Sequence, residues 1–96
     1  MSTNWGAWTI VTQGKVDQQY DDALLKYERF NEAYDALIWL LARKPTIGLC
    51  NEYDGVEYWI HVQDGDSIAR TPAIWVLYRL NHQEVILENI NVVPYE

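Results

Sequence analysis

One long segment of the chain carries apolar residues at a helical spacing. They lie three or four positions apart without a break, at Val16, Tyr20, Ala23, Tyr27, Phe30, Tyr34, Leu37 and Leu41. This spacing places them on one face of an α-helix. Pro45 ends the helical pattern, because proline disfavours helical geometry in the residue before it. The pattern predicts helix over about 16–43, either as one long helix or as a hairpin that turns near Arg29 to Glu32, with Asn31 as the cap of the second helix.

The rest of the chain has the composition of β-strands. Segments rich in β-branched and aromatic residues span 7–13, 47–53, 56–62, 73–80 and 85–93. Asp54-Gly55 is a strong hairpin signal, and Asn81 to Gln83 forms a polar turn before the last strand. The order predicts a single α+β domain over residues 1–96. Its elements are an N-terminal strand, the helical region, and an antiparallel meander of three or four strands with the helices on one face.

Alternation within the predicted strands indicates which side chains share a face. The strand 56–62 has one apolar row, which includes Ile60 and Val62, and one mixed row with Trp59 and His61. In the strand 73–80, Trp75 points away from the row of its aliphatic neighbours. We therefore expect Trp59 and Trp75 to lie together on the sheet face that is turned away from the core. With Arg70, they form the predicted partner-binding surface.

The charge distribution disfavours nucleic acid as a partner. Fourteen acidic residues against seven basic ones give a net charge of −7. Residues 49–96 hold eight of the acids and only two bases, Arg70 and Arg79, so the deficit belongs to the predicted sheet. Such a surface repels a phosphate backbone. The sequence has no visible signal peptide and no apolar run that approaches the length of a membrane span, so we expect a soluble, cytoplasmic protein.

No pattern of metal-binding or cofactor-binding residues is present. The single cysteine, Cys50, and two separated histidines do not match a zinc site, and we expect no metal and no cofactor. Cys50 indicates a reducing compartment and is expected to be a buried free thiol. The five glycines are scattered singly, so no phosphate-binding loop is predicted.

Several segments resemble the RelE/ParE toxin superfamily of bacterial type II toxin–antitoxin systems. The runs PAIWVLYRL (72–80) and QEVILENI (83–90) are similar to its last two strands. Leu37 to Leu41, followed by Pro45 and Gly48, is similar to its second helix and the exit from that helix. Val56 to His61 is similar to its first central strand. The resemblance covers most of the chain from about residue 9 and implies the order strand–helix–helix–three strands.

The residues that catalysis would need in this superfamily do not carry over. Its ribosome-dependent ribonucleases place basic residues on the central strands, and those positions correspond here to Trp59 and Trp75. The basic pair that follows the last strand is replaced near residues 92–94. No catalytic residue is assigned; the candidates for proton transfer or phosphate contact are His61, Arg79 and Tyr95. Without clustered cations, phosphodiester cleavage loses its main electrostatic stabilisation.

Three functional hypotheses result. The first is a toxin-like component of a toxin–antitoxin module that acts by protein contacts, as the gyrase-inhibiting ParE branch does, and this mode of action needs no catalytic residues. Its partner is a cognate antitoxin-like protein, another protein target or a second copy of the chain. The second is a divergent ribosome-dependent mRNA endonuclease of the RelE kind. The third is a non-toxic acidic binding module.

Overall fold

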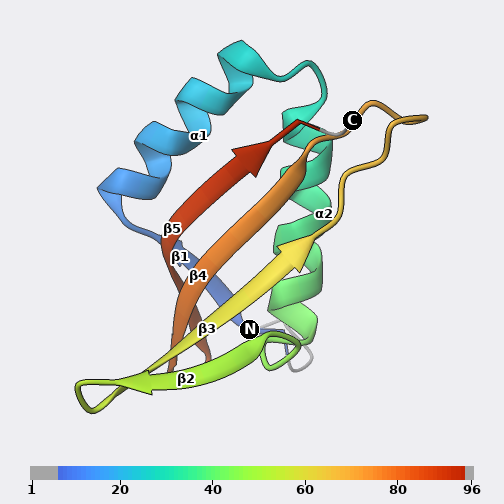
Figure 1. Cartoon of the computed structure of the whole chain (residues 1–96). Coiled ribbons are helices and arrows are strands. Elements are labelled where there is room, and N and C mark those ends of the chain that lie inside the picture. Colours follow the sequence, from blue (N-terminus) through green and yellow to red (C-terminus); the bar gives the residue numbers. More distant parts are fainter. Residues whose placement is uncertain (1–6, 95–96) are drawn as a thin grey trace, which may run out of the picture.

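The structure is a computed structural model that describes residues 7–94 of the chain. Its elements in order are β1 (Thr9–Thr12), α1 (Gly14–Lys26), α2 (Phe30–Arg43), β2 (Leu49–Tyr53), β3 (Val56–Gln63), β4 (Ala73–Asn81) and β5 (Glu84–Val93). The predicted α+β order is confirmed, and the meander has four strands (Figure 1).

The strands form one five-stranded sheet in the order β1-β5-β4-β3-β2. Strands β2 to β5 pair antiparallel with their neighbours along the chain, whereas β1 pairs parallel with β5, with Thr9 opposite Glu84. No pattern in the sequence indicates this parallel pair. It joins the first strand to the last one, so the chain between β1 and β2 must cross from one edge of the sheet to the other.

The helical region is a hairpin. Helix α1 ends at Lys26, because Tyr27 adopts an extended conformation with φ −120° and ψ 121°. Helix α2 starts at Phe30, so Asn31 lies inside its first turn and the expectation that Asn31 caps the helix is wrong. The predicted apolar stripe is confirmed. Phe30, Leu37 and Leu41 are fully buried, and the stripe's tyrosines pack against the core.

An aromatic cluster holds the two helices together. The ring centroid of Tyr20 in α1 lies 5.3 Å from that of Phe30 and 4.8 Å from that of Tyr34, with edge-to-face geometry in both pairs. Such arrangements are favourable because the positive ring edge meets the negative ring face. Burial raises the pKa of Tyr34 to about 12, so its hydroxyl stays protonated.

Tyr78 anchors the connection from α2 to β2 onto the sheet. It is fully buried in β4, and its hydroxyl donates a hydrogen bond to the carbonyl oxygen of Pro45 at 2.6 Å and accepts one from the backbone N–H of Gly48 at 3.3 Å. Gly48 is required at this close approach, since a Cβ there would lie 2.6 Å from the carbonyl oxygen of Ile60. Burial raises the pKa of Tyr78.

Neither helix that the structure describes is long and apolar enough to cross a membrane.

The core position of Leu37 gives a first test. Leu37→Ala removes a fully buried side chain and should lower the free energy of unfolding by about 2–5 kcal/mol in urea denaturation. Leu25→Ala is the matched control, because Leu25 is 88% exposed in α1 and its truncation should change stability by less than about 0.5 kcal/mol. A loss below about 1 kcal/mol for Leu37→Ala would contradict the packing described here.

Candidate protein-binding face of the sheet

The helices cover one face of the sheet and leave the other open. In β4, Ile74, Val76 and Tyr78 are buried in the core with residues of both helices, and Trp75 alternates with them on the opposite face. In the view of Figure 1, α2 lies behind the sheet and the open face is turned toward the reader. Because side chains alternate along a strand, the pairing register assigns every other strand residue to one of these faces.

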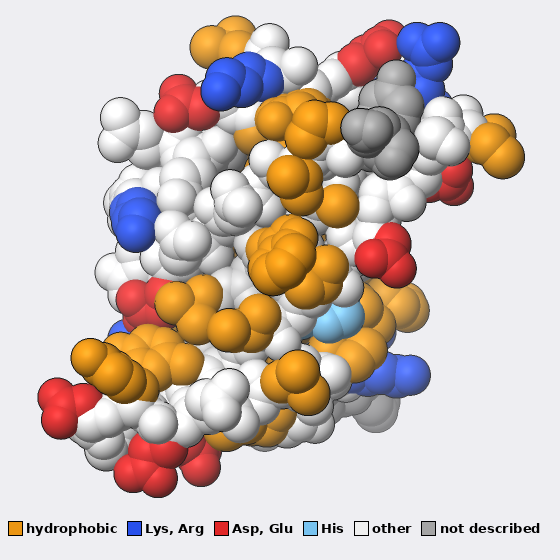
Figure 2. Space-filling model, viewed as in Figure 1, with side chains coloured by type: hydrophobic (Ala, Val, Ile, Leu, Met, Phe, Trp, Pro, Cys, Tyr) orange, Lys and Arg blue, Asp and Glu red, His pale blue; other side chains and the backbone are white. Residues whose placement is uncertain are grey.

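The open face carries a continuous group of apolar side chains from three strands. The group, referred to below as the open-face band, consists of Leu49, Tyr53, Val56, Tyr58, Ile60, Val62, Trp75 and Leu77. Most of its members are exposed, and Trp75 is 50% exposed. Figure 2 shows apolar side chains running from the middle of the sheet to the β2–β3 hairpin, whose tip is acidic. Contiguous apolar surface of this kind marks interaction sites in soluble proteins.

The band is hollowed in two places. A shallow depression of about 250 Å³ is lined mainly by Ile60, Trp75, Leu77 and Asn91. A second depression, of about 480 Å³, lies between the hairpin and Lys15, with Tyr53 and Tyr58 on its wall. Apolar walls with a few amide and charged groups at the rim suit the side chains of another protein.

Arg79 is held at the rim of this face by an ion pair. The register between β4 and β5 shifts next to Leu77 and Tyr78, which leaves Glu88 as the extra residue of a β-bulge. The Nε of Arg79 donates to Oε2 of Glu88 at 2.6 Å, and both side chains are largely shielded from solvent.

The structure does not bring the catalytic candidates together. His61 pairs with the buried Val76, so its side chain lies on the helix-covered face, whereas Arg79 lies on the open face. His61 and Arg79 therefore do not contribute to one site on the sheet. Tyr95 lies outside the described residues.

The two tryptophans expected to share a docking face lie on opposite faces. Trp59 pairs with Tyr78 and stacks on its ring, with centroids 6.3 Å apart, so it packs against the core. Trp75 pairs with Val62 on the open face. The assignment of faces in β3 was thus inverted: the mixed row with Trp59 and His61 faces the helices, and the apolar row with Ile60 faces out. The aliphatic members of the open-face band were taken for core and were missed.

Arg70 and Cys50 also lie apart from Trp75. Arg70 is in the β3–β4 loop, with its guanidinium 4.0 Å from the carboxylate of Glu28 near the turn between the helices. Cys50 pairs with Trp59 at the sheet edge and is exposed, so the expectation of a buried thiol is wrong. Partial desolvation and the carboxylates of Glu57 and Glu52 raise the pKa of Cys50, which makes its thiol a poor nucleophile.

The acidic residues of the described chain do not gather into a candidate metal site. No group of three potential metal ligands occurs among residues 7–94. In the β3–β4 loop, the carboxylate of Asp66 accepts hydrogen bonds from the backbone N–H groups of Ile68 and Ala69, which closes the loop on itself.

Comparisons with protein-family models, curated proteins and solved structures find no match to this chain.

The partly buried position of His61 predicts a pH dependence of stability. Partial burial lowers its pKa below the ordinary value of 6.5, against the opposing attraction of Asp64. The unfolded chain therefore binds a proton at His61 before the folded chain does, and stability falls as the pH drops below about 6.5. In urea denaturation at about pH 7.5 and 5.5, His61→Gln should lose less stability on acidification than the wild type. Parallel pH dependence of the two proteins would contradict this environment for His61.

The placement of the basic residues predicts weak binding of nucleic acid. Arg79 is paired with Glu88, Arg29 with Glu32, and the guanidinium of Arg43 lies over the ring of Trp39. A labelled single-stranded RNA titrated between about 50 and 200 mM salt should give a log–log slope of about 2 or less in magnitude. A slope near about 6 would mean that the helix bases act together on one surface, and it would contradict the prediction.

Proposed function

We propose that this chain works by protein contacts made through the open-face band, as a toxin-like component of a bacterial toxin–antitoxin module. The observation that carries the proposal is the band itself: apolar side chains of three adjacent strands stand exposed on a face that no described helix covers. The partner is an antitoxin-like protein or a cellular protein target, and the role belongs to the cytoplasm.

The element order supports the link to the RelE/ParE superfamily. That resemblance implied strand–helix–helix–three strands, and the chain has this order with one more strand in the meander. Two residues that carried the resemblance, Pro45 and Gly48, also have a structural role. The carbonyl oxygen of Pro45 accepts a hydrogen bond from the hydroxyl of Tyr78, and the N–H of Gly48 donates one to it. The proposal therefore rests on the open face for the mode of action and on the resemblance for the biological role.

The endonuclease alternative has less support. His61 and Arg79 lie on opposite faces of the sheet, and the guanidinium of Arg79 is already bound to Glu88. A phosphate clamp would have to break this partly buried ion pair before it could hold a substrate. Protein contacts need no such rearrangement.

Substitution of Trp75 tests the proposal in growing bacteria. Trp75→Ser removes the largest side chain of the open-face band and should weaken partner binding by about 2 kcal/mol or more, as is usual for a central tryptophan. Expression of the wild type should arrest growth with cellular mRNA intact, and Trp75→Ser should relieve the arrest. Trp39→Ser is the matched control, because Trp39 is similarly exposed, at 58%, but lies on α2; it should remain inhibitory.

Each other outcome points to a different function. Growth arrest with cleaved mRNA would favour the endonuclease. No effect of the wild type on growth would favour a non-toxic binding module. Equal relief by both variants, with thermal unfolding unchanged, would show that the contacts are not made by the open face.

A further inference from the structure

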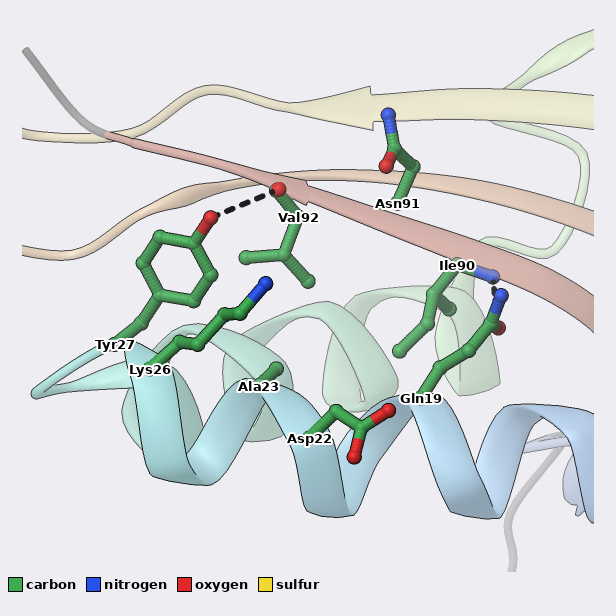
Figure 3. A pocket seen from close by; sticks show the side chains of 8 residues that line it. All are labelled: Gln19, Asp22, Ala23, Lys26, Tyr27, Ile90, Asn91 and Val92. Carbon is green, nitrogen blue, oxygen red and sulfur yellow. Dashed lines mark hydrogen bonds between the residues drawn. The ribbon is translucent and has the colours of Figure 1, made fainter.

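The two long edges of the sheet are finished in different ways. On the β5 edge, beyond the short strand β1, side chains of the helical region form hydrogen bonds with backbone groups of β5. Oε1 of Gln19 accepts a hydrogen bond from the N–H of Ile90 at 2.9 Å, and the hydroxyl of Tyr27 donates to the carbonyl oxygen of Val92 at 3.3 Å (Figure 3). These contacts take the place of a neighbouring strand, so this edge is partly closed.

The opposite edge, β2, has no such protection in the part of the chain that the structure describes. All five residues of β2 are exposed, and its only neighbour in the sheet is β3. Proteins usually guard an exposed edge with proline, with charged side chains, above all lysine, or with a β-bulge. The strand LCNEY contains no proline or lysine, its one charged residue is Glu52, and its register with β3 is regular. It is therefore a template on which another strand can pair.

The hairpin turn determines which backbone groups of β2 point outward. Asp54 and Gly55 have φ values of 56° and 82°, as a two-residue type I′ turn requires. Such a turn makes its flanking residues, Tyr53 and Val56, a hydrogen-bonded pair. Because hydrogen-bonded and non-hydrogen-bonded pairs alternate, the N–H and C=O groups of Cys50 and Glu52 point away from β3. These four groups are free to pair with an added strand.

The side chains along this edge specify a partner with two different faces. Leu49 and Tyr53, each 76% exposed, extend the open-face band to the edge. On the other face lie the carboxylates of Glu52 and Glu57, which are directly paired across β2 and β3. No lysine or arginine occurs between residues 45 and 69, so nothing in this segment neutralises them. An added strand therefore meets an apolar row on one side and a negative row on the other.

We propose that the free edge of β2 binds an extended segment of a partner protein in which apolar and basic residues alternate, as a sixth strand of the sheet. The inference rests on the proposed function as a protein-binding chain. A second copy of this chain fits the edge less well, because its own β2–β3 hairpin would bring Glu52, Asp54 and Glu57 against the same carboxylates. A basic segment gains attraction where a second copy meets repulsion.

Amide hydrogen exchange tests the proposal residue by residue. The probe is an end-blocked seven-residue peptide in which Val and Lys alternate, added to the full ¹⁵N-labelled chain. Binding should slow the exchange of the Cys50 and Glu52 amides by about tenfold or more, because both gain a hydrogen bond to the peptide. The amides of Asn51 and Tyr53 already bond to β3 and should change little, so they are an internal control.

Variants and altered peptides test the charge requirement. Glu52→Gln with Glu57→Gln should weaken binding of the peptide about 3- to 10-fold, as expected for two exposed ion pairs. Asp21→Asn with Asp22→Asn makes the same change in net charge on the exposed side of α1 and should leave binding unaltered. A peptide with Glu in place of Lys should not bind. One with Val and Lys in separate blocks should not protect the two amides.

Two results would overturn the inference. If the peptide binds without protection of Cys50 and Glu52, it contacts the molecule elsewhere. If these amides are protected without peptide, increasingly so at higher protein concentration, then the occupant of the edge is a second copy. Either result leaves the proposed function standing if Trp75→Ser still relieves growth arrest. If the peptide protects the edge but the chain has no effect on growth, the inference about the edge stands and the proposed toxin-like function fails.

Discussion

A single connection carries both helices of this fold from one edge of the sheet to the other. Strand β1 pairs with β5 at one edge and β2 forms the opposite edge, so α1 and α2 together make the crossing between them. The remaining connections are two tight turns and one loop, none of which contains a helix. The crossing runs over one face, and the described chain has no further helix to cover the other. The central strand β4, however, is apolar on both faces, since Trp75 and Leu77 alternate with Ile74 and Val76. The exposed band is thus a consequence of the topology.

Sequence periodicity predicted the elements well because each depends on local chemistry. The stripe from Val16 to Leu41 needs only a helix with one buried face, and the Asp54-Gly55 pair determines its turn through backbone conformation alone. The parallel pairing of β1 with β5 depends instead on contacts between residues more than seventy positions apart. Short apolar strands give no local indication of such a partner. For the same reason, alternation showed which residues share a face but did not show which face meets the helices.

The candidate site was mispredicted because the wrong row of β3 was assigned to the same face as Trp75 in β4. The mixed row of β3 was taken as outward because it contains Trp59 and His61. In the structure this row faces inward. Trp59 stacks on Tyr78, and Gln63, in the same row, donates a hydrogen bond to the carbonyl oxygen of Ala33 in α2. Tryptophan and glutamine can be covered in this way because each has a polar group that finds a partner or stays near solvent. The aliphatic row of Ile60 and Val62 was then left outside. Hydrophobicity of a row is therefore weak evidence for burial where both rows of a neighbouring strand are apolar.

The acidic charge of the sheet half opposes pairing of this surface with a second copy of the chain. An apolar band next to an open strand edge favours association of the chain with itself. The carboxylates of Glu52, Asp54 and Glu57 lie at that edge in a segment, 45–69, that contains no lysine or arginine, and they oppose the approach of an identical hairpin. Like-charge repulsion of this kind discriminates against wrong partners, and the same charges attract a partner of opposite charge. The same three residues thus disfavour self-association and select for a basic segment. A variant with a neutral hairpin and the same band would bind a second copy of itself more tightly. It would no longer discriminate between that copy and a basic partner segment.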